Sequence, residues 1–283
     1  MSHDSKGILY VVATPIGNLD DITLRALKVL KSVQLVAAED TRRTGILLRH
    51  FQIETPILSV HEHNERSRVE QIVHRLATGQ SVALVTDAGT PAISDPGAAL
   101  VAETRAAGFR VEPIPGASAV VAALSASGVD SNGFAFLGFP PIRGKDRKQW
   151  LSELALEVEQ RAVVFYEAPH RISKTLAEID SFVKRPIIVV RELTKVHEEF
   201  VEGLPGHLGA KFMSTQGEFT VIVPPTPVGH NVTEAPPDSV VMNKFGELTK
   251  NTTFASKKDA ARALATQLGL STRVVYGILE RNK

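Results

Sequence analysis

Residues 86–97, with the sequence TDAGTPAISDPG, form the segment of the chain best suited to ligand binding. They follow an apolar run that predicts a strand, and they precede a predicted helix. Ligands of open α/β sheets bind at this edge, where strands end and helices begin. Glycines let the backbone come close to a ligand, and N–H groups at a helix start attract a carboxylate or a phosphate. A tight structural turn explains the same composition, so this segment alone leaves both interpretations open.

Two further loops have the same setting. Residues 14–21 (TPIGNLDD) follow the first predicted strand, and residues 115–119 (PGASA) lead into a helix. Three such loops, each after a strand, predict a cleft that is lined by backbone. The usual nucleotide motifs are missing, because no G-x-G-x-x-G follows the first strand and residues 143–146 (RGKD) lack the Ser or Thr of a P-loop.

The elements that position these loops alternate between strand and helix. Short apolar strands joined by helices are buried on both faces, which is typical of a largely parallel sheet. The predicted strands of this first unit are residues 8–13, 33–38, 57–60, 81–86 and 110–114, and its predicted helices are residues 22–31, 64–78 and 98–107.

A second α/β unit follows a break at Pro113, Pro115 and Gly116. Its predicted strands are residues 134–138, 162–166, 187–191, 199–202 and 218–223, and its predicted helices are residues 117–126, 148–159, 170–182 and 205–213. We therefore expect an N-terminal α/β domain at residues 7–115, a C-terminal α/β domain at 116–225, a linker at 226–250 and a helical module at 251–283. The module has a helix–turn–helix pattern, with helices at 257–268 and 271–280.

Composition limits the chemistry further. The 283 residues include no cysteine, which excludes disulfides, thiolate zinc sites and iron–sulfur clusters. His61, Glu62 and His63 do not have the H-E-x-x-H spacing of a zinc site, and we expect no metal. No apolar run approaches the ~20 residues of a membrane span, and the first residues do not resemble a signal peptide, so a cytoplasmic protein is expected.

Six motifs carry a resemblance to a known family. They are TPIGNLDDIT (14–23), AEDTR (38–42), TDAGTPAISDPG (86–97), PGAS (115–118), FYEAPHR (165–171) and RELTK (191–195). In this order they resemble the tetrapyrrole-methylase superfamily, and within it the branch that methylates 16S ribosomal RNA. Small-molecule members carry a shorter Gly-Asp-Pro loop. Ala117 departs from the branch, which has proline at this position.

The resemblance implies a fold and a reaction. The fold is two α/β domains with S-adenosylmethionine in the cleft between them, plus the small helical module. The reaction is direct in-line transfer of a methyl group to the ribose 2′-hydroxyl of a cytidine in small-subunit 16S rRNA. The resemblance also implies a homodimer. Because the net charge is only +1, we expect an assembled small subunit to be preferred over free RNA.

The resemblance also suggests which residues form the site. The hydroxyl must lose a proton, so a polar side chain near the cleft would accept it. Candidates for this role are Asp40, Asp87, Glu167 and His170, although each could serve only to cap a helix or hold a turn. The donor would contact Pro15, Gly17, Asp87, Gly89, Thr90, Ser94, Ala117, Ser118, Tyr166, Leu193 and Thr220.

Basic residues are candidates for RNA contact. Arginine can grip a phosphate with two hydrogen bonds, although ordinary surface charges explain the same residues. Residues 143–148 are predicted to be a mobile basic loop. The candidates are Arg42, Arg43, Arg143, Lys145, Arg147, Arg171 and Lys195.

Two other functions remain open at this point. One is a small-molecule methylase of tetrapyrrole or precorrin synthesis, which would share the fold and the donor. The other is a non-catalytic RNA-binding or ribosome-assembly protein. The basic segment and the helical module favour RNA over the first, and the intact loops at 14–21, 86–97 and 115–118 favour catalysis over the second.

Overall fold

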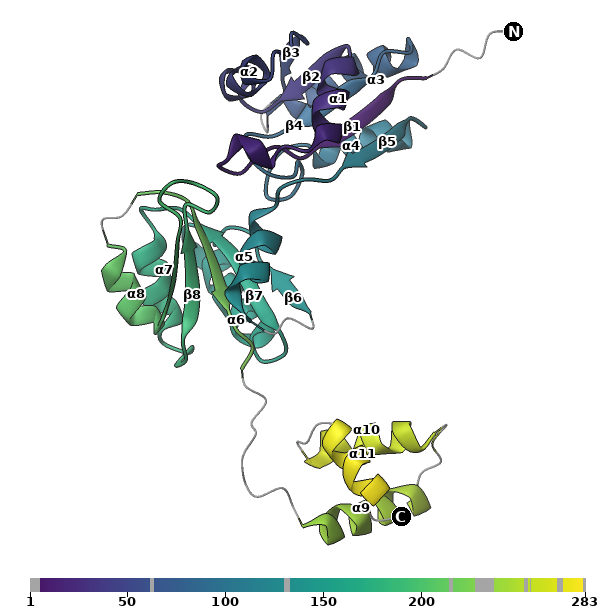
Figure 1. Ribbon diagram of the computed structural model, residues 1–283, viewed down its shortest axis with the longest axis vertical. Helices are drawn as coiled ribbons and strands as arrows, with labels where there is room; N and C mark the ends of the chain where they lie inside the picture. The colour runs from purple at the N-terminus through teal and green to yellow at the C-terminus, as the bar shows by residue number, and fades with distance from the viewer. Residues whose placement is uncertain are drawn as a thin grey trace. The chain divides into compact units, whose positions relative to one another are not determined.

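The computed structural model describes residues 6–61, 64–129, 133–213, 216–226, 237–251, 254, 256–268 and 272–281 (Figure 1). The chain divides into two compact units, and each is described by itself. The first comprises Met1–Glu157 with Arg161–Pro224, and the second comprises Val158–Gln160 with Pro225–Lys283.

The first unit begins with a parallel five-stranded sheet. Its strands are β1 (Ile8–Val12), β2 (Leu35–Ala38), β3 (Ile57–Ser59), β4 (Val82–Val85) and β5 (Arg110–Ile114), in the order β3-β2-β4-β1-β5. Every pairing is parallel, as the sequence predicts. The carboxyl ends of β1, β2 and β4 therefore meet at one edge, where the loops beginning at Ala13, Glu39 and Thr86 lie.

Helices cover both faces of this sheet. Apolar residues of α1 (Leu24–Ser32) and α2 (Thr41–His50) pack on one face, and those of α3 (Glu65–Ala77) and α4 (Ala98–Ala106) pack on the other. No bounds were predicted for α2, although Asp40 was considered as a possible helix cap. This helix begins because the Asp40 side chain accepts a hydrogen bond from the Arg42 N–H at 2.8 Å, which caps its first turn.

The second sheet of the same unit is mostly antiparallel. Its strands are β6 (Phe134–Phe136), β7 (Ala162–Glu167), β8 (Ile187–Arg191), β9 (Glu199–Gly203) and β10 (Phe219–Val223), in the order β6-β7-β10-β8-β9. Only β6 and β7 pair in parallel. The helices of this half are α5 (Ala119–Ser127), α6 (Gly144–Glu157), α7 (Ile172–Ile179) and α8 (Pro205–Lys211).

Helices again pack on both faces of this sheet. Val120 and Leu124 of α5 pack in a cluster with Val164 of β7. Neighbouring strand residues point to opposite faces, so Phe165 faces away from α5 and meets Trp150 of α6, with ring centroids 5.1 Å apart. The Trp150 side chain also donates to the Leu137 carbonyl at 3.0 Å, so α6 holds the residue that follows β6.

Two predicted irregular segments are helical. The basic segment at 143–148 was expected to be a mobile loop, but α6 begins at Gly144 and includes most of it. The expected linker at 226–250 contains α9 (Asp238–Asn251). Together with α10 (Lys257–Leu268) and α11 (Thr272–Arg281), α9 builds a three-helix core around Val241, Leu264 and Ile278. Within the described residues, no helix is long and apolar enough to cross a membrane.

Candidate active site

The first unit has two halves, and each consists of one sheet and the helices packed on it. A cavity of about 480 Å³ opens where these two halves meet. From the first half it takes residues that follow β1, β2 and β4, and from the second it takes residues at the ends of β6, β7, β8 and β10. Its lining is Ile16, Glu39, Arg43, Asp87, Ala88, Gly89, Thr90, Ile93, Ser94, Asp95, Ser118, Ala119, Phe139, Tyr166, Glu167, Ala168, Pro169, Leu193, Glu218, Phe219 and Thr220. We call this space the central cavity.

The loop at 86–97 supplies the largest share of that lining. Gly89 has φ +81°, which glycine adopts without strain, and it exchanges two backbone hydrogen bonds with Thr14, at 2.9 and 3.1 Å. Ala92 and Ser94 also have positive φ, of 67° and 61°, which is unusual for residues with a side chain. The Thr90 hydroxyl donates to the Ala117 carbonyl at 3.4 Å. The three glycine-bearing loops predicted to form one cleft are thus tied together.

Most residues predicted to contact a donor lie around this space. Asp87, Gly89, Thr90, Ser94, Ser118, Tyr166, Leu193 and Thr220 line it, whereas Pro15, Gly17 and Ala117 do not. Gly17 has a different reason to be glycine. A Cβ there would lie 2.5 Å from Lys195 Cγ and 2.9 Å from the Leu193 carbonyl oxygen. Gly17 therefore lets the β1 loop pack against the turn after β8, and its predicted contact with the donor stays a prediction.

The four predicted proton acceptors fall into two groups. Asp87 and Glu167 line the central cavity, whereas Asp40 and the exposed His170 do not. Asp40 caps α2 and pairs with Arg42 at 2.7 Å, and this guanidinium lowers the pKa of the Asp40 carboxyl far below its usual range. Asp40 and His170 lie outside the lining of the central cavity, and their role in proton transfer stays a prediction.

Glu167 is buried and fully engaged. Its Oε1 accepts from the Ala168 N–H at 2.8 Å and pairs with Arg171 at 2.6 Å, and its Oε2 accepts from the Thr175 hydroxyl at 2.5 Å. All of these contacts lie within the protein, between Glu167 and the residues that begin α7. Glu167 thus orders the end of β7.

Asp87 belongs to an acidic group in the central cavity whose other members, Glu39 and Asp95, were not predicted as site residues. The three residues come from the loops after two adjacent parallel strands, β2 and β4. Burial and the charges of Glu39 and Asp87 raise the pKa of Asp95 to about 6, and a hydrogen bond from Thr86 partly offsets them. Burial, and next the charge of Asp87, also raise the pKa of Glu39. These residues were not grouped from the sequence because local patterns do not show that β2 and β4 are adjacent in the sheet.

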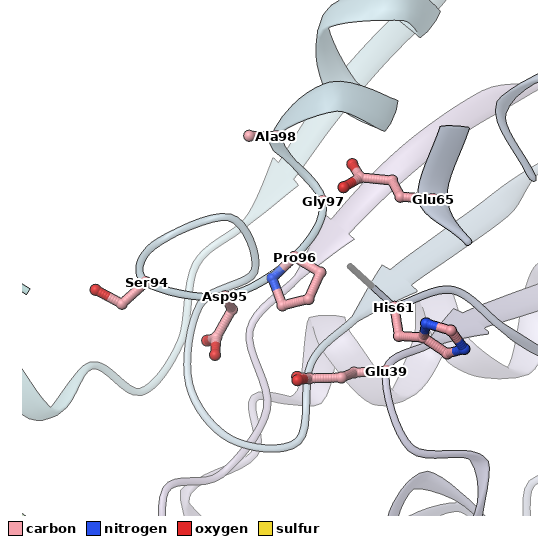
Figure 2. A pocket seen from close by; sticks show the side chains of 8 residues that line it. All are labelled: Glu39, His61, Glu65, Ser94, Asp95, Pro96, Gly97 and Ala98. Atoms are coloured by element: carbon pink, nitrogen blue, oxygen red, sulfur yellow. The ribbon is translucent and has the colours of Figure 1, made fainter. Parts of the chain in front are cut away.

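A second cavity, of about 690 Å³, adjoins the first, and we call it the outer cavity. It shares Glu39, Ser94 and Asp95 with the central cavity. Figure 2 shows the carboxyl groups of Glu39 and Asp95 directed to the same region, with His61 beyond Pro96. Glu65 accepts a hydrogen bond from the Leu100 N–H at 2.7 Å and so holds the start of α4. Glu62 and His63 lie outside the described residues.

Of the predicted RNA contacts, Arg42, Arg143 and Lys145 are exposed, with 88% of the Arg42 side chain open to solvent. Arg43 lines the central cavity and lies 3.4 Å from Asp87. Lys195 pairs with Glu192 at 2.9 Å and with Glu218 at 2.8 Å.

Arg147 contradicts its prediction. The side chain is buried, and it donates to Glu178 at 2.8 Å, to the Thr175 hydroxyl at 2.8 Å and to the Pro141 carbonyl at 2.8 Å. Arg171 pairs with Glu167 and donates to the Pro140 carbonyl at 3.1 Å. Both arginines therefore hold the protein's own backbone, and Arg147 is removed from the RNA surface.

Comparison with known proteins identifies the family. The sequence model described as "Tetrapyrrole (Corrin/Porphyrin) Methylases" matches residues 8–208. The Synechocystis protein named ribosomal RNA small subunit methyltransferase I is 49% identical over 77% of this chain and 78% of its own. Its namesake from Halalkalibacterium halodurans is 40% identical over 97% of this chain and 95% of its own. That from Pseudomonas aeruginosa is 51% identical, over 71% of each chain.

Solved structures share the fold. A cobalt precorrin-4 methyltransferase of cobalamin biosynthesis superposes with a TM-score of 0.59 at 18% identity, covering 78% of this chain and 97% of its own. A diphthine synthase gives 0.61 at 14% identity, covering 77% and 90%. These likenesses confirm the predicted fold class of two α/β halves. From its motifs, its fold and its relatives, this chain belongs to the tetrapyrrole (corrin/porphyrin) methylase family.

Proposed function

We propose that this protein transfers a methyl group from S-adenosylmethionine to the ribose 2′-hydroxyl of a cytidine in 16S rRNA. The relatives that are 40–51% identical carry the name of a small-subunit ribosomal RNA methyltransferase. The observation that carries the proposal is the central cavity, where the 86–97 loop faces residues of the second sheet. We place the enzyme in the cytoplasm, where ribosomal RNA is made in bacteria.

The residues present fit the donor. A cavity of about 480 Å³ lies in the size range of small-molecule sites. The donor carries a sulfonium and an ammonium charge, and Glu39, Asp87 and Asp95 provide opposite charge. Leu193 and Ile16 provide apolar contact. Gly89, Thr90, Ser94, Ser118 and Thr220 offer backbone or hydroxyl groups for the nucleoside part.

We assign the role of proton acceptor to Asp95. In an in-line displacement the ribose oxygen bonds to the methyl carbon, the carbon–sulfur bond breaks and sulfur keeps its electron pair. The hydroxyl proton must leave the oxygen in the same step or soon after. A carboxyl with a pKa of about 6 is ionised at pH 7.5 and is a better base than an ordinary aspartate. Asp87 remains beside it, paired with Arg43.

The two alternatives are less well supported. The tetrapyrrole and precorrin enzymes are similar to this chain only at 18% identity, which carries the fold and not the acceptor. A non-catalytic protein would have no need of a strained ligand loop, yet Ala92 and Ser94 keep positive φ. Methyl transfer to rRNA accounts for both the loop and the names of the relatives.

The test of this proposal has two parts. Titration calorimetry should detect binding of S-adenosylmethionine to the purified protein. Incubation with labelled donor and small subunits from a strain that lacks the enzyme should then place the label in 16S rRNA. Donor binding with label transfer to a uroporphyrinogen or precorrin, and none to rRNA, would overturn the acceptor. Absence of donor binding would overturn catalysis.

We also propose that the acceptor is the assembled small subunit and that the enzyme acts as a homodimer. The net charge of +1 is low for a protein that holds free RNA through phosphates. Transfer to intact subunits should therefore be faster than transfer to protein-free 16S rRNA, and equal rates would refute this. The dimer rests on the family resemblance, and sedimentation at assay concentrations should give twice the mass of one chain.

A further inference from the structure

Two large apolar side chains stand half exposed around the central cavity. Phe139, in the segment after β6, is 50% exposed, and Ile93, in the 86–97 loop, is 51% exposed. Both line the cavity, although they come from different halves of the unit. Large apolar side chains are stabilised by burial, so exposed ones at the opening of a ligand site indicate a surface that a ligand covers.

The backbone around Phe139 is fixed on one side by β7. The Tyr166 N–H donates to the Gly138 carbonyl at 2.9 Å, and Gly138 has φ +58°. The rings of Phe139 and Tyr166 lie 5.4 Å apart at 54°, and the Tyr166 ring also contacts Phe136 at 5.0 Å. Phe139 is therefore the outermost ring of an aromatic group that extends outward from the second sheet.

The residues that follow are fixed by two arginines, of which Arg147 is buried and Arg171 is partly buried. Arg171 donates to the Pro140 carbonyl, and Arg147 donates to the Pro141 carbonyl. Each arginine is held in turn by a carboxylate, Glu167 for Arg171 and Glu178 for Arg147. Two prolines with both carbonyls bound make a stiff segment, so the Phe139 ring is held in place before any ligand arrives.

The same segment touches the ligand loop. A Cβ on Gly138 would lie 3.2 Å from the Ser94 hydroxyl, so the Gly138 backbone lies against the Ser94 side chain. Phe139 thus lies beside the loop proposed to hold the donor, on the exposed side of the cavity. By contrast Thr220 and Phe219, deeper in the lining, are almost fully buried. An acceptor entering from solvent would meet Phe139 before it met those residues.

We propose that Phe139 is the platform on which the nucleobase of the methylated nucleotide stacks, with Ile93 as a second apolar contact. This inference rests on the proposed function. Proteins hold splayed-out RNA bases against aromatic faces, and each such stack contributes about 1–3 kcal/mol. Stacking at Phe139 would fix the attached ribose next to Asp95, which lines the same cavity. The aromatic ring thereby selects a nucleotide that has left its helix.

The main variant is Phe139→Ala, with Phe139→Tyr as the conservative partner. The matched control is Ile142→Ala, since Ile142 lies on the same segment, is 71% exposed and is not among the cavity-lining residues. We expect Phe139→Ala to raise KM for small subunits by about 5- to 150-fold, which corresponds to the loss of one stack. Phe139→Tyr and Ile142→Ala should stay near wild type, and all three should bind S-adenosylmethionine with unchanged Kd.

A modified substrate isolates the nucleobase. Reconstituted small subunits would carry either the normal target cytidine or an abasic ribose, which keeps the 2′-hydroxyl. On the abasic substrate, the KM of the wild type should rise about as much as Phe139→Ala raises it on the normal substrate. The KM of Phe139→Ala should be the same on both substrates, because this variant has already lost the ring on which the base stacks.

Three results would overturn the inference. One is a Phe139→Ala penalty that persists on the abasic substrate. The second is a Phe139→Ala penalty that Phe139→Tyr shares in full. The third is weaker donor binding by Phe139→Ala, which would place the adenine of the donor on this ring. A wild type that binds the donor but methylates no rRNA would instead refute the proposed function.

Discussion

At the scale of single residues, three carboxyl groups of the first unit have different environments. Asp40 pairs with an exposed arginine and lies outside the central cavity, and Glu167 is held by three donors. Asp95 is partly buried beside two other acids, which keeps its carboxyl basic. Residue type therefore says little about role here, because charge partners and burial decide which carboxyl can take a proton.

Substitution of Asp95 tests its role as base. Asp95→Asn should lower the rate of single-turnover methyl transfer by about 10²- to 10⁴-fold at saturating S-adenosylmethionine, where the weaker donor binding caused by the lost charge no longer limits the rate. In the wild type the rate should fall as pH drops through about 6, because the folded-state pKa of Asp95 is raised and protonation removes the acceptor. Rapid-quench assays from pH 5 to 8 would measure both effects.

The control is Glu70→Gln, an exposed carboxylate of α3 that should leave rate and pH profile unchanged. An Asp95→Asn enzyme with near-normal turnover, or a wild-type profile that is flat across pH 6, would contradict the assignment.

Gly17 is a second test at this scale. Gly17→Ala should destabilise the protein by about 1–3 kcal/mol, because the new Cβ would collide with the Leu193 carbonyl oxygen and the Lys195 side chain. Denaturant unfolding would measure the loss. Gly133→Ala, where a Cβ meets nothing within 4 Å, should cost far less. If both variants unfold alike, the close contact between the β1 loop and the β8 turn does not stabilise the fold.

At the scale of elements, the sequence predicts the first half well and the second half in part. Parallel strands buried on both faces appear as continuous apolar runs, so β1, β2, β4 and their order along the chain were found. Helix α2 was missed because its apolar residues are interrupted by Arg42, Arg43 and Gly45. The antiparallel pairing of β10 with β7 and β8 depends on contacts distant in sequence, which local patterns do not encode.

The site residues were predicted well where local sequence was enough and poorly where contacts between distant residues decide their positions. Loops after predicted strands were placed correctly, since strand ends can be read locally. Arg147 was misplaced because a cluster of basic letters reads as surface, while Glu178 and Thr175, which bury it, are 31 and 28 residues away. Asp95 was missed because its pKa is raised first by burial and then by the charge of Glu39, which approaches it only when β2 pairs with β4.

Arg147 also provides the prediction for this scale. Arg147→Ala should destabilise the protein by about 3 kcal/mol, because Glu178 and the Pro141 carbonyl lose a buried partner. Lys145→Ala, on the exposed side of α6, should change stability by less than about 0.5 kcal/mol. Chemical denaturation of both variants would check this. Equal stability of Arg147→Ala and wild type would mean that the arginine does not hold α6 and α7 together.

At the scale of the whole molecule, most of the cations predicted to contact RNA pair with acids of the same chain. Arg42, Arg43, Arg147, Arg171 and Lys195 each have such a partner, while Arg143 and Lys145 are exposed. The chain therefore offers fewer cations to RNA phosphates than its sequence indicates. Such a surface suits an acceptor whose shape and proteins supply further contacts, which agrees with the proposed preference for an assembled subunit.

The most direct test of the central claim is identification of the methylated nucleoside. Purified protein, isotopically labelled S-adenosylmethionine and small subunits from a strain that lacks this enzyme would be incubated together, and the rRNA would be digested and analysed by mass spectrometry. The account predicts one labelled product, 2′-O-methylcytidine, which Asp95→Asn forms far more slowly. Label on a base, label on another ribose, or no label in rRNA despite bound donor would contradict it.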